Sequence, residues 1–191
     1  MKKVRLCIGA FLFLLLMFSS HTVLAQPFPA LEQMNGKWLK MSGSVNGWAV
    51  TAFQANVVPE KFKASLNNMY ACVTYDLDAT AADLTIRDAS GTQIGTGLLY
   101  YYGGTVDQWL AYMSLSLDSR GDYSANGADM KLYANTLAKT KNGAEKGSFK
   151  AFGMDGYIDN DAEYADLGGK LNAKIVGEVP WSGLCINFIP L

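Results

Sequence analysis

Apolar and polar residues alternate along most of the chain after residue 70. Val73, Tyr75 and Leu77 are apolar, and Thr74 and Asp76 separate them. A period of two residues places one set of side chains on each face of a sheet. The pattern therefore predicts antiparallel strands with one apolar and one polar face. The same period recurs at 84–87, 94–102, 109–117, 130–134 and 170–175.

Turn sequences separate these runs. Asp88-Ala89-Ser90-Gly91 predicts a hairpin, and glycine-containing turns follow at 103–104, 120–122, 126–127 and 141–143. The spacing predicts about eight to ten strands. Closing into a barrel removes the exposed edges of such a series. We expect one all-β domain, residues 26–191, folded as a single antiparallel β-barrel, with a β-sandwich as the alternative.

Two segments depart from the alternation. Residues 59–68 predict a short helix or an irregular connection. Residues 26–34 predict a loose arm that ends in a helical turn before the first strand.

The first 25 residues have the order of a secretory signal peptide. Lys2, Lys3 and Arg5 give a positive start, an apolar run covers residues 6–18, and Val23-Leu24-Ala25 supplies short residues before a cut site. A run of 13 apolar residues is too short for a membrane helix, which needs about 20. We expect cleavage after Ala25 and a periplasmic or secreted protein.

Charge argues against polyanionic partners. The segment 26–191 keeps 13 basic and 17 acidic side chains, a net charge of −4. A protein without a basic surface does not bind nucleic acid or anionic lipid through phosphate contacts. We expect neither partner, and we expect no integral membrane association.

Two cysteines remain in the expected mature chain, Cys72 and Cys185. An even number of cysteines in an exported protein favours a disulfide, with two buried thiols as the alternative. Cys72 has the opposite parity from Val73, Tyr75 and Leu77. Its side chain is therefore expected on the other face, where a C-terminal segment could cross the barrel wall.

The segment Gly36-Lys37-Trp38, placed where the first strand is expected, resembles the Gly-x-Trp signature of the lipocalins. In that family the tryptophan closes one end of an eight-stranded barrel. Many lipocalins also have a disulfide from a middle strand to the C-terminal segment, and Cys72 and Cys185 have similar places. The resemblance implies a lipocalin-like, calycin-type barrel in which Gly36 and Trp38 are structural.

The expected mature chain lacks most catalytic signatures. Its single histidine, His21, belongs to the signal peptide, which excludes Ser-His-Asp and Cys-His sites and the usual zinc sites. Carboxylates such as Asp155, Asp159 and Glu163 remain the candidates for an enzyme, which we do not expect. We expect no cofactor and no metal site. An acidic stretch around Asp159 is rich enough in oxygen ligands for calcium but lacks the spacing of the helix-loop-helix motif; it includes Asp155, Asp159, Asn160, Asp161, Glu163 and Asp166.

Aromatic residues are the remaining candidates for a binding site. Tyr and Trp side chains that face a cavity supply apolar surface with a hydrogen-bonding tip. The alternation places Ile94, Leu98, Tyr100 and Tyr102 on one face. The candidates for ligand binding are Trp48, Tyr100, Tyr102, Trp109 and Tyr112.

Two functional hypotheses follow. The first is an exported, non-enzymatic barrel that binds a small apolar or amphipathic ligand. The alternative is a structural or outer-membrane barrel. Pro190 in the last six residues counts against a membrane barrel, because proline removes a hydrogen-bond donor from a final strand.

Overall fold

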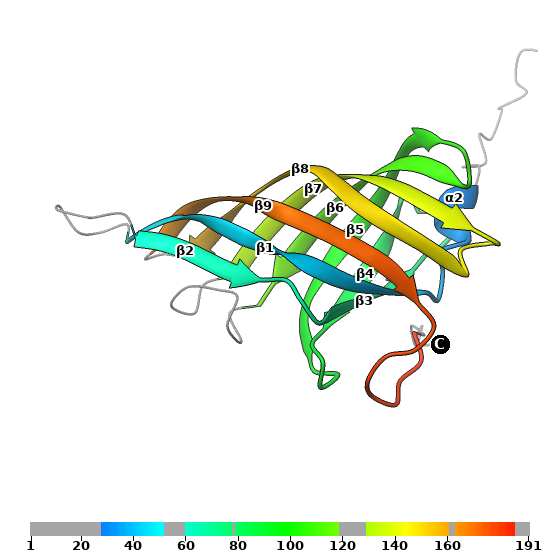
Figure 1. Ribbon diagram of the computed structural model, residues 1–191, viewed down its shortest axis with the longest axis horizontal. Helices are drawn as coiled ribbons and strands as arrows, with labels where there is room; N and C mark the ends of the chain where they lie inside the picture. The colour runs from blue at the N-terminus through cyan, green and yellow to red at the C-terminus, as the bar shows by residue number, and fades with distance from the viewer. Residues whose placement is uncertain (1–27, 52–59, 78, 119–128, 161–162, 186–191) are drawn as a thin grey trace, which may run out of the picture.

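The computed structural model describes residues 28–51, 60–77, 79–118, 129–160 and 163–185. The expected signal peptide and the turns expected at 120–122 and 126–127 lie outside these residues. Figure 1 shows a barrel with a short helix at one end. The elements are α2 (Pro29–Glu32), β1 (Trp38–Thr51), β2 (Glu60–Ser65), β3 (Met69–Thr74), β4 (Ala81–Arg87), β5 (Gln93–Gly104), β6 (Gln108–Leu117), β7 (Asp129–Lys141), β8 (Lys146–Asn160) and β9 (Glu163–Val176).

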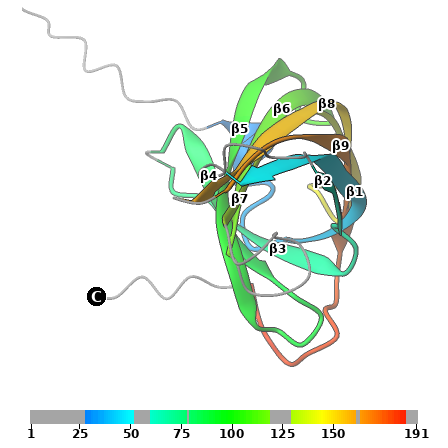
Figure 2. The same cartoon turned by 90° about the vertical axis from the view of Figure 1, so that its left-hand side faces the viewer.

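Eight antiparallel strands close into a barrel, and one further strand lies outside the ring (Figure 2). Strands β3 to β9 follow one another in sequence order, and β1 lies between β3 and β9. The closing pair, β1 with β9, extends from Trp38 opposite Val176 to Thr51 opposite Glu163. The barrel prediction is confirmed, and the sandwich alternative is wrong, because β1 joins both ends of one sheet.

The turns predicted at 88–91 and 141–143 are confirmed, whereas Gly103 and Gly104, also predicted as a turn, are the last residues of β5, and the turn follows them. The hairpin at 88–92 joins β4 to β5, residues 105–107 join β5 to β6, and residues 142–145 join β7 to β8. The helical turn expected before the first strand is α2. No helix among the described residues is long and apolar enough to cross a membrane.

Residues 60–65 form a strand rather than a helix or an irregular connection. β2 pairs with Ser44–Ala49 of β1, and β3 pairs with Trp38–Met41 of the same strand. β2 and β3 therefore follow one another along one edge of β1, separated by residues 66–68, of which Asn68 has a left-handed φ of 61°. Hydrogen bonding to β1 makes this segment a strand. The pattern of residues within the segment does not show such a contact.

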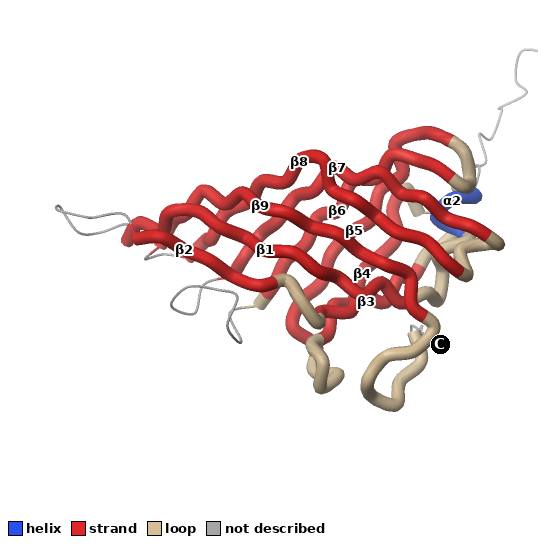
Figure 3. Tube along the Cα trace, viewed as in Figure 1, coloured by secondary structure: helices blue, strands red, loops and turns tan. Residues whose placement is uncertain are grey.

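The barrel interior is filled by apolar side chains. Alternate residues of every barrel strand point inward and form one continuous cluster that includes Leu39, Met113, Leu132 and Phe149. Leu31 of α2 joins this core at one end of the barrel, which Figure 3 shows with the helix in blue. Small barrels of eight strands have an interior just wide enough for side chains.

A β-bulge in β5 changes which side chains face the core. The register of β4 and β5 shifts beside Ile94, which has no partner on β4. An extra residue reverses the alternation beyond it. Ile94 and Leu99 are consequently both buried. The prediction of one shared face is therefore wrong, because Ile94 points inward while Leu98, Tyr100 and Tyr102 point outward.

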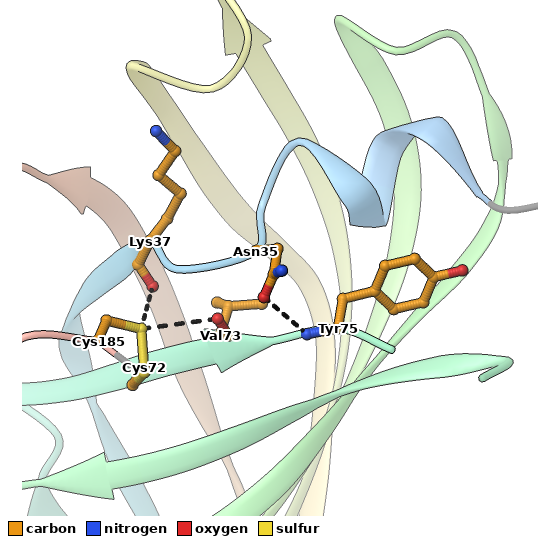
Figure 4. The surroundings of a disulfide bond; sticks show 6 residues. All are labelled: Asn35, Lys37, Cys72, Val73, Tyr75 and Cys185. Atoms are coloured by element: carbon orange, nitrogen blue, oxygen red, sulfur yellow. Dashed lines mark hydrogen bonds between the residues drawn. A yellow bond between two sulfur atoms is a disulfide. The ribbon is translucent and has the colours of Figure 1, made fainter. Parts of the chain in front are cut away.

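A disulfide joins Cys72 to Cys185 with a Cα–Cα distance of 5.2 Å, as predicted. Figure 4 shows Cys185 close to the start of the first strand, where its Sγ lies 3.4 Å from the carbonyl oxygen of Lys37. Cys72 points away from the core, so the segment after β9 lies across the outer face of β1 and β3. The bond is consistent with an oxidising, non-cytoplasmic location.

Trp38 also lies on the outer face, beneath the C-terminal segment. It belongs to a second buried cluster with Tyr70, Cys72 and Cys185, packed against Val176, Val179 and Trp181. The neighbouring Leu39 points into the barrel core. The lipocalin resemblance implied that Trp38 closes the barrel end from inside. Here α2 has that position, and Trp38 packs on the outer face against the segment that follows β9.

Candidate functional site

The outer face of β4, β5 and β6 has a groove of about 440 Å³. Pairing places Thr85 opposite Thr96, and Thr96 opposite Ser116. Directly opposite residues of an antiparallel pair point to the same side of the sheet. The side chains that face the groove are therefore mostly short and hydroxyl-bearing: Asp83, Thr85, Thr96, Leu98, Ser114 and Ser116.

The groove is hollow because small residues lie beside large ones in the register. Ser114 pairs with Tyr133 of β7, and Ser116 pairs with Lys131. Along the strands, the next outward row is Tyr100 opposite Tyr112. Tyrosine and lysine side chains thus rise around a floor of serine and threonine.

The hydroxyl groups of the floor are available to a ligand. Lys131 Nζ donates a hydrogen bond to the Ser116 hydroxyl. Within the described part of the chain, this is the single hydrogen bond made by the floor's hydroxyl groups. Hydroxyl groups both donate and accept, so Thr85, Thr96 and Ser114 offer both roles to a bound molecule.

A row of tyrosines continues from the groove across four strands. Tyr112 of β6 lies between Tyr102 of β5, at 6.1 Å between ring centroids, and Tyr133 of β7, at 6.2 Å. Tyr133 lies 6.2 Å from Tyr157 of β8, and Tyr100 lies 6.0 Å from Tyr112. We call these five residues the tyrosine row.

Burial and neighbouring groups raise the pKa of two phenols of the row, Tyr112 and Tyr133. Desolvation, followed by the Asp155 carboxylate, raises the pKa of Tyr112 above its ordinary value. A hydrogen bond with Tyr157 is the main cause that raises the pKa of Tyr133. Tyr112 and Tyr133 therefore present uncharged rings with hydroxyl tips next to the Asp155 carboxylate.

The five predicted ligand-binding residues do not line one cavity. Trp109 is 1% exposed and points into the core, where it contacts Tyr101 and Phe149 at 5.7 and 5.5 Å between centroids. Tyr112, three residues later on the same strand, points outward. Residues an odd number of positions apart in a strand point to opposite faces, so Trp109 and Tyr112 cannot line the same face.

The structure brings three of the predicted residues together and separates the other two. Tyr100, Tyr102 and Tyr112 meet in the tyrosine row. Trp48 lies elsewhere on the outer face, on β1, where it is 53% exposed and Lys61 Nζ lies 5.5 Å from its ring centroid. Trp109 remains a core residue.

Sequence reasoning missed Tyr133, Tyr157 and the groove itself. Tyr133 falls between the buried Leu132 and Ala134, so its place on the polar parity of β7 was a readable signal. The groove left no such signal, because it depends on which strands pair and in which register.

Only part of the acidic stretch that is the candidate for calcium binding lies in the described part of the chain. Among the described residues, no group of three or more potential metal-binding side chains converges. In the acidic stretch, Asp155 lies on the outer face beside the tyrosine row, and Asp161 lies outside the described residues.

Comparisons with protein-family models, curated proteins and solved structures found no match for this chain. The interpretation of the site therefore depends on the chemistry of its own residues.

Proposed function

We propose that this chain is an exported, non-enzymatic barrel, periplasmic or secreted, that binds a small amphipathic ligand on its outer face. The observation that carries the proposal is the groove on β4–β6, whose lining combines Leu98 with hydroxyl groups and the Asp83 carboxylate. Such a mixed lining suits a molecule with one apolar side and several polar groups.

The filled interior directs the proposal to the outside. A lipocalin-like barrel would hold its ligand within the cup, whereas here Trp109, Phe149 and Leu31 occupy that space with at most 1% exposure. The closed barrel and the disulfide are compatible with a lipocalin-like relationship. The ligand site that we propose does not depend on that relationship.

The distribution of polarity favours this function over the outer-membrane alternative. Membrane barrels have an apolar outer band and a polar lumen. Here the interior is apolar, while Lys40, Asn172 and Lys174 are exposed on the outer face of β1 and β9. Lipid contact would bury two lysine charges and an amide at a cost of several kcal/mol in total.

The absence of enzymatic activity is part of the proposal. The expected mature chain has no histidine, and among the described residues Ser116 with Lys131 is a pair of a hydroxyl and an amine in contact. Lysine activates serine when burial removes its proton, and Lys131 is only half-buried. We expect no turnover from this pair.

Amide chemical-shift mapping tests the groove. The probes are n-octyl glucoside below its micellar concentration and sodium cholate, each titrated into the mature protein. We expect chemical-shift changes confined to β4–β6. Thr96→Trp fills the groove and should abolish these changes. Asn172→Trp, a matched change at an exposed residue of β9, should leave them as in the wild type. Shifts at Leu31 and Phe149, which belong to the interior core, instead of on β4–β6, or no shifts with either probe, would contradict the proposal.

A further inference from the structure

The tyrosine row extends beyond the groove, and its length argues for a ligand longer than one small molecule. Tyr100 and Tyr112 border the groove, while Tyr157 on β8 lies two strands beyond Ser114. Consecutive centroids are separated by 6.0 to 6.2 Å along the whole row. A repeated contact of this kind suits a chain of similar units.

The side chains around the row identify the chemistry of each unit. Aromatic rings contact apolar surface, and their phenol groups form hydrogen bonds at the edge. Asp83 and Asp155 accept hydrogen bonds, Lys131 donates them, and the serine and threonine hydroxyls do both. A pyranose ring matches this set, because it combines a face of C–H groups with a rim of hydroxyls that donate and accept.

We propose that the groove and the tyrosine row form a continuous binding surface for a neutral glycan chain. This inference rests on the outer-face binding function proposed above and names its ligand class. The surface has two carboxylates, Asp83 and Asp155, against one ammonium group, Lys131, and the expected net charge is −4. This excess of negative charge favours neutral sugars over uronic or sulfated chains. Export would place the protein among extracellular or envelope glycans.

A peptide partner suits the surface less well. Protein interfaces concentrate their energy in a buried apolar anchor that fills a pocket. The groove offers Leu98 as its one outward aliphatic side chain, among hydroxyl groups and a carboxylate. Its lining therefore favours a ligand with many hydroxyl groups.

Calorimetric titration tests the inference with defined probes: cellohexaose, maltohexaose, xylohexaose and chitohexaose. We expect at least one hexasaccharide to bind. Tyr112→Ala and Tyr133→Ala should each weaken that binding by about tenfold, the effect of losing one aromatic contact. Phe152→Ala is the matched control, because Phe152 is an exposed aromatic of β8 outside the row, and it should leave the affinity unchanged.

Tyr112→Phe guards against a folding artefact. It keeps the ring and should retain more affinity than Tyr112→Ala, and unfolding curves of all variants show whether the barrel is intact. Equal losses in Tyr112→Ala and Phe152→Ala, or hexasaccharide binding that is insensitive to the row, would overturn the inference.

The outcomes separate this inference from the function on which it rests. If cholate or octyl glucoside binds in the groove and no hexasaccharide binds, the glycan proposal is overturned and the small-ligand function stands. If none of the detergent, bile-salt or hexasaccharide probes binds, both proposals are overturned. A wild-type dimer in sedimentation that Tyr133→Ala dissociates would show that a second copy covers the row, and this too would overturn the inference.

Discussion

Trp181 packs edge-on against Trp38, with ring centroids 5.5 Å apart and an interplanar angle of 88°. It makes the same type of contact with Tyr70 at 5.1 Å. T-shaped pairs place the positive edge of one ring against the negative face of another. The contact holds the segment after β9 on the outer wall of the barrel, next to the disulfide.

Removing the disulfide should destabilise the barrel strongly. The bond joins residues 113 positions apart, and loss of a native disulfide from a small exported domain costs about 2–5 kcal/mol, mostly through the unfolded chain. We expect Cys72→Ala/Cys185→Ala to lower the midpoint of urea unfolding by that free energy. A midpoint unchanged from that of the oxidised wild type would show that the disulfide contributes nothing to stability.

Gly91 should resist substitution because of Trp181. Its φ is 88°, and a Cβ atom there would lie 2.8 Å from Cγ of Trp181. Gly143 is the matched control, with φ of 62° and no atom within 4 Å of the added Cβ. Both alanine variants strain the backbone by about 1 kcal/mol, and Gly91→Ala should lose a further 1–3 kcal/mol or so from overpacking. Equal losses in urea unfolding would contradict the contact.

Tyr112 and Tyr133 of the tyrosine row should ionise at a higher pH than an ordinary tyrosine. The pKa values of Tyr112 and Tyr133 are both raised above 10.0 in the folded protein. The stability that this shift contributes is present below pH 10.0 and is lost as the pH rises through the folded pKa. We expect the ultraviolet signal of tyrosinate to show groups that ionise above the ordinary range.

Two variants show which tyrosines ionise at high pH. Tyr157→Phe should lower the pKa of Tyr133, because it removes the hydrogen bond that is the main cause of the shift. Asp155→Asn should lower the pKa of Tyr112 more modestly, since desolvation is the larger cause there. Titration curves identical to wild type in both variants would exclude these contacts as the cause.

Asp88 should stabilise the β4–β5 hairpin in a pH-dependent way. Its Oδ1 accepts hydrogen bonds from the backbone N–H groups of Ser90 and Thr92 and from the Ser90 hydroxyl. These bonds, the Ser90 hydroxyl first, lower the pKa of Asp88 below 3.8.

Because the folded pKa is depressed, the contribution is present above pH 3.8 and is lost as the pH falls through the folded pKa. Asp88→Ala should cost about 1 kcal/mol at neutral pH. The deficit relative to wild type should shrink in unfolding curves at strongly acidic pH. A deficit that stays constant down to that pH would mean that the carboxylate charge has no role.

Local patterns along the chain are enough to predict the class of fold and the turns after β4 and β7. Alternation in β6, β7 and the later part of β9 identified the inward side chains correctly, and Asp88–Gly91 marked a hairpin, because these features depend on near neighbours in the chain. The opposite parities of Cys72 and Val73 also placed the cysteine on the outer face. For the same local reason, Tyr133 could have been assigned to the outer face from β7 alone.

Tertiary structure decided the faces and the site. One unpaired residue at Ile94 turned Tyr100 and Tyr102 outward, and the strand position of Trp38 placed it under Trp181 rather than at the barrel floor. The groove exists because Thr96 and Ser116 pair side by side while Tyr112 and Tyr133 occupy the neighbouring positions. Register is a non-local property, since hydrogen bonds between distant strands fix it, and no pattern within one strand contains it.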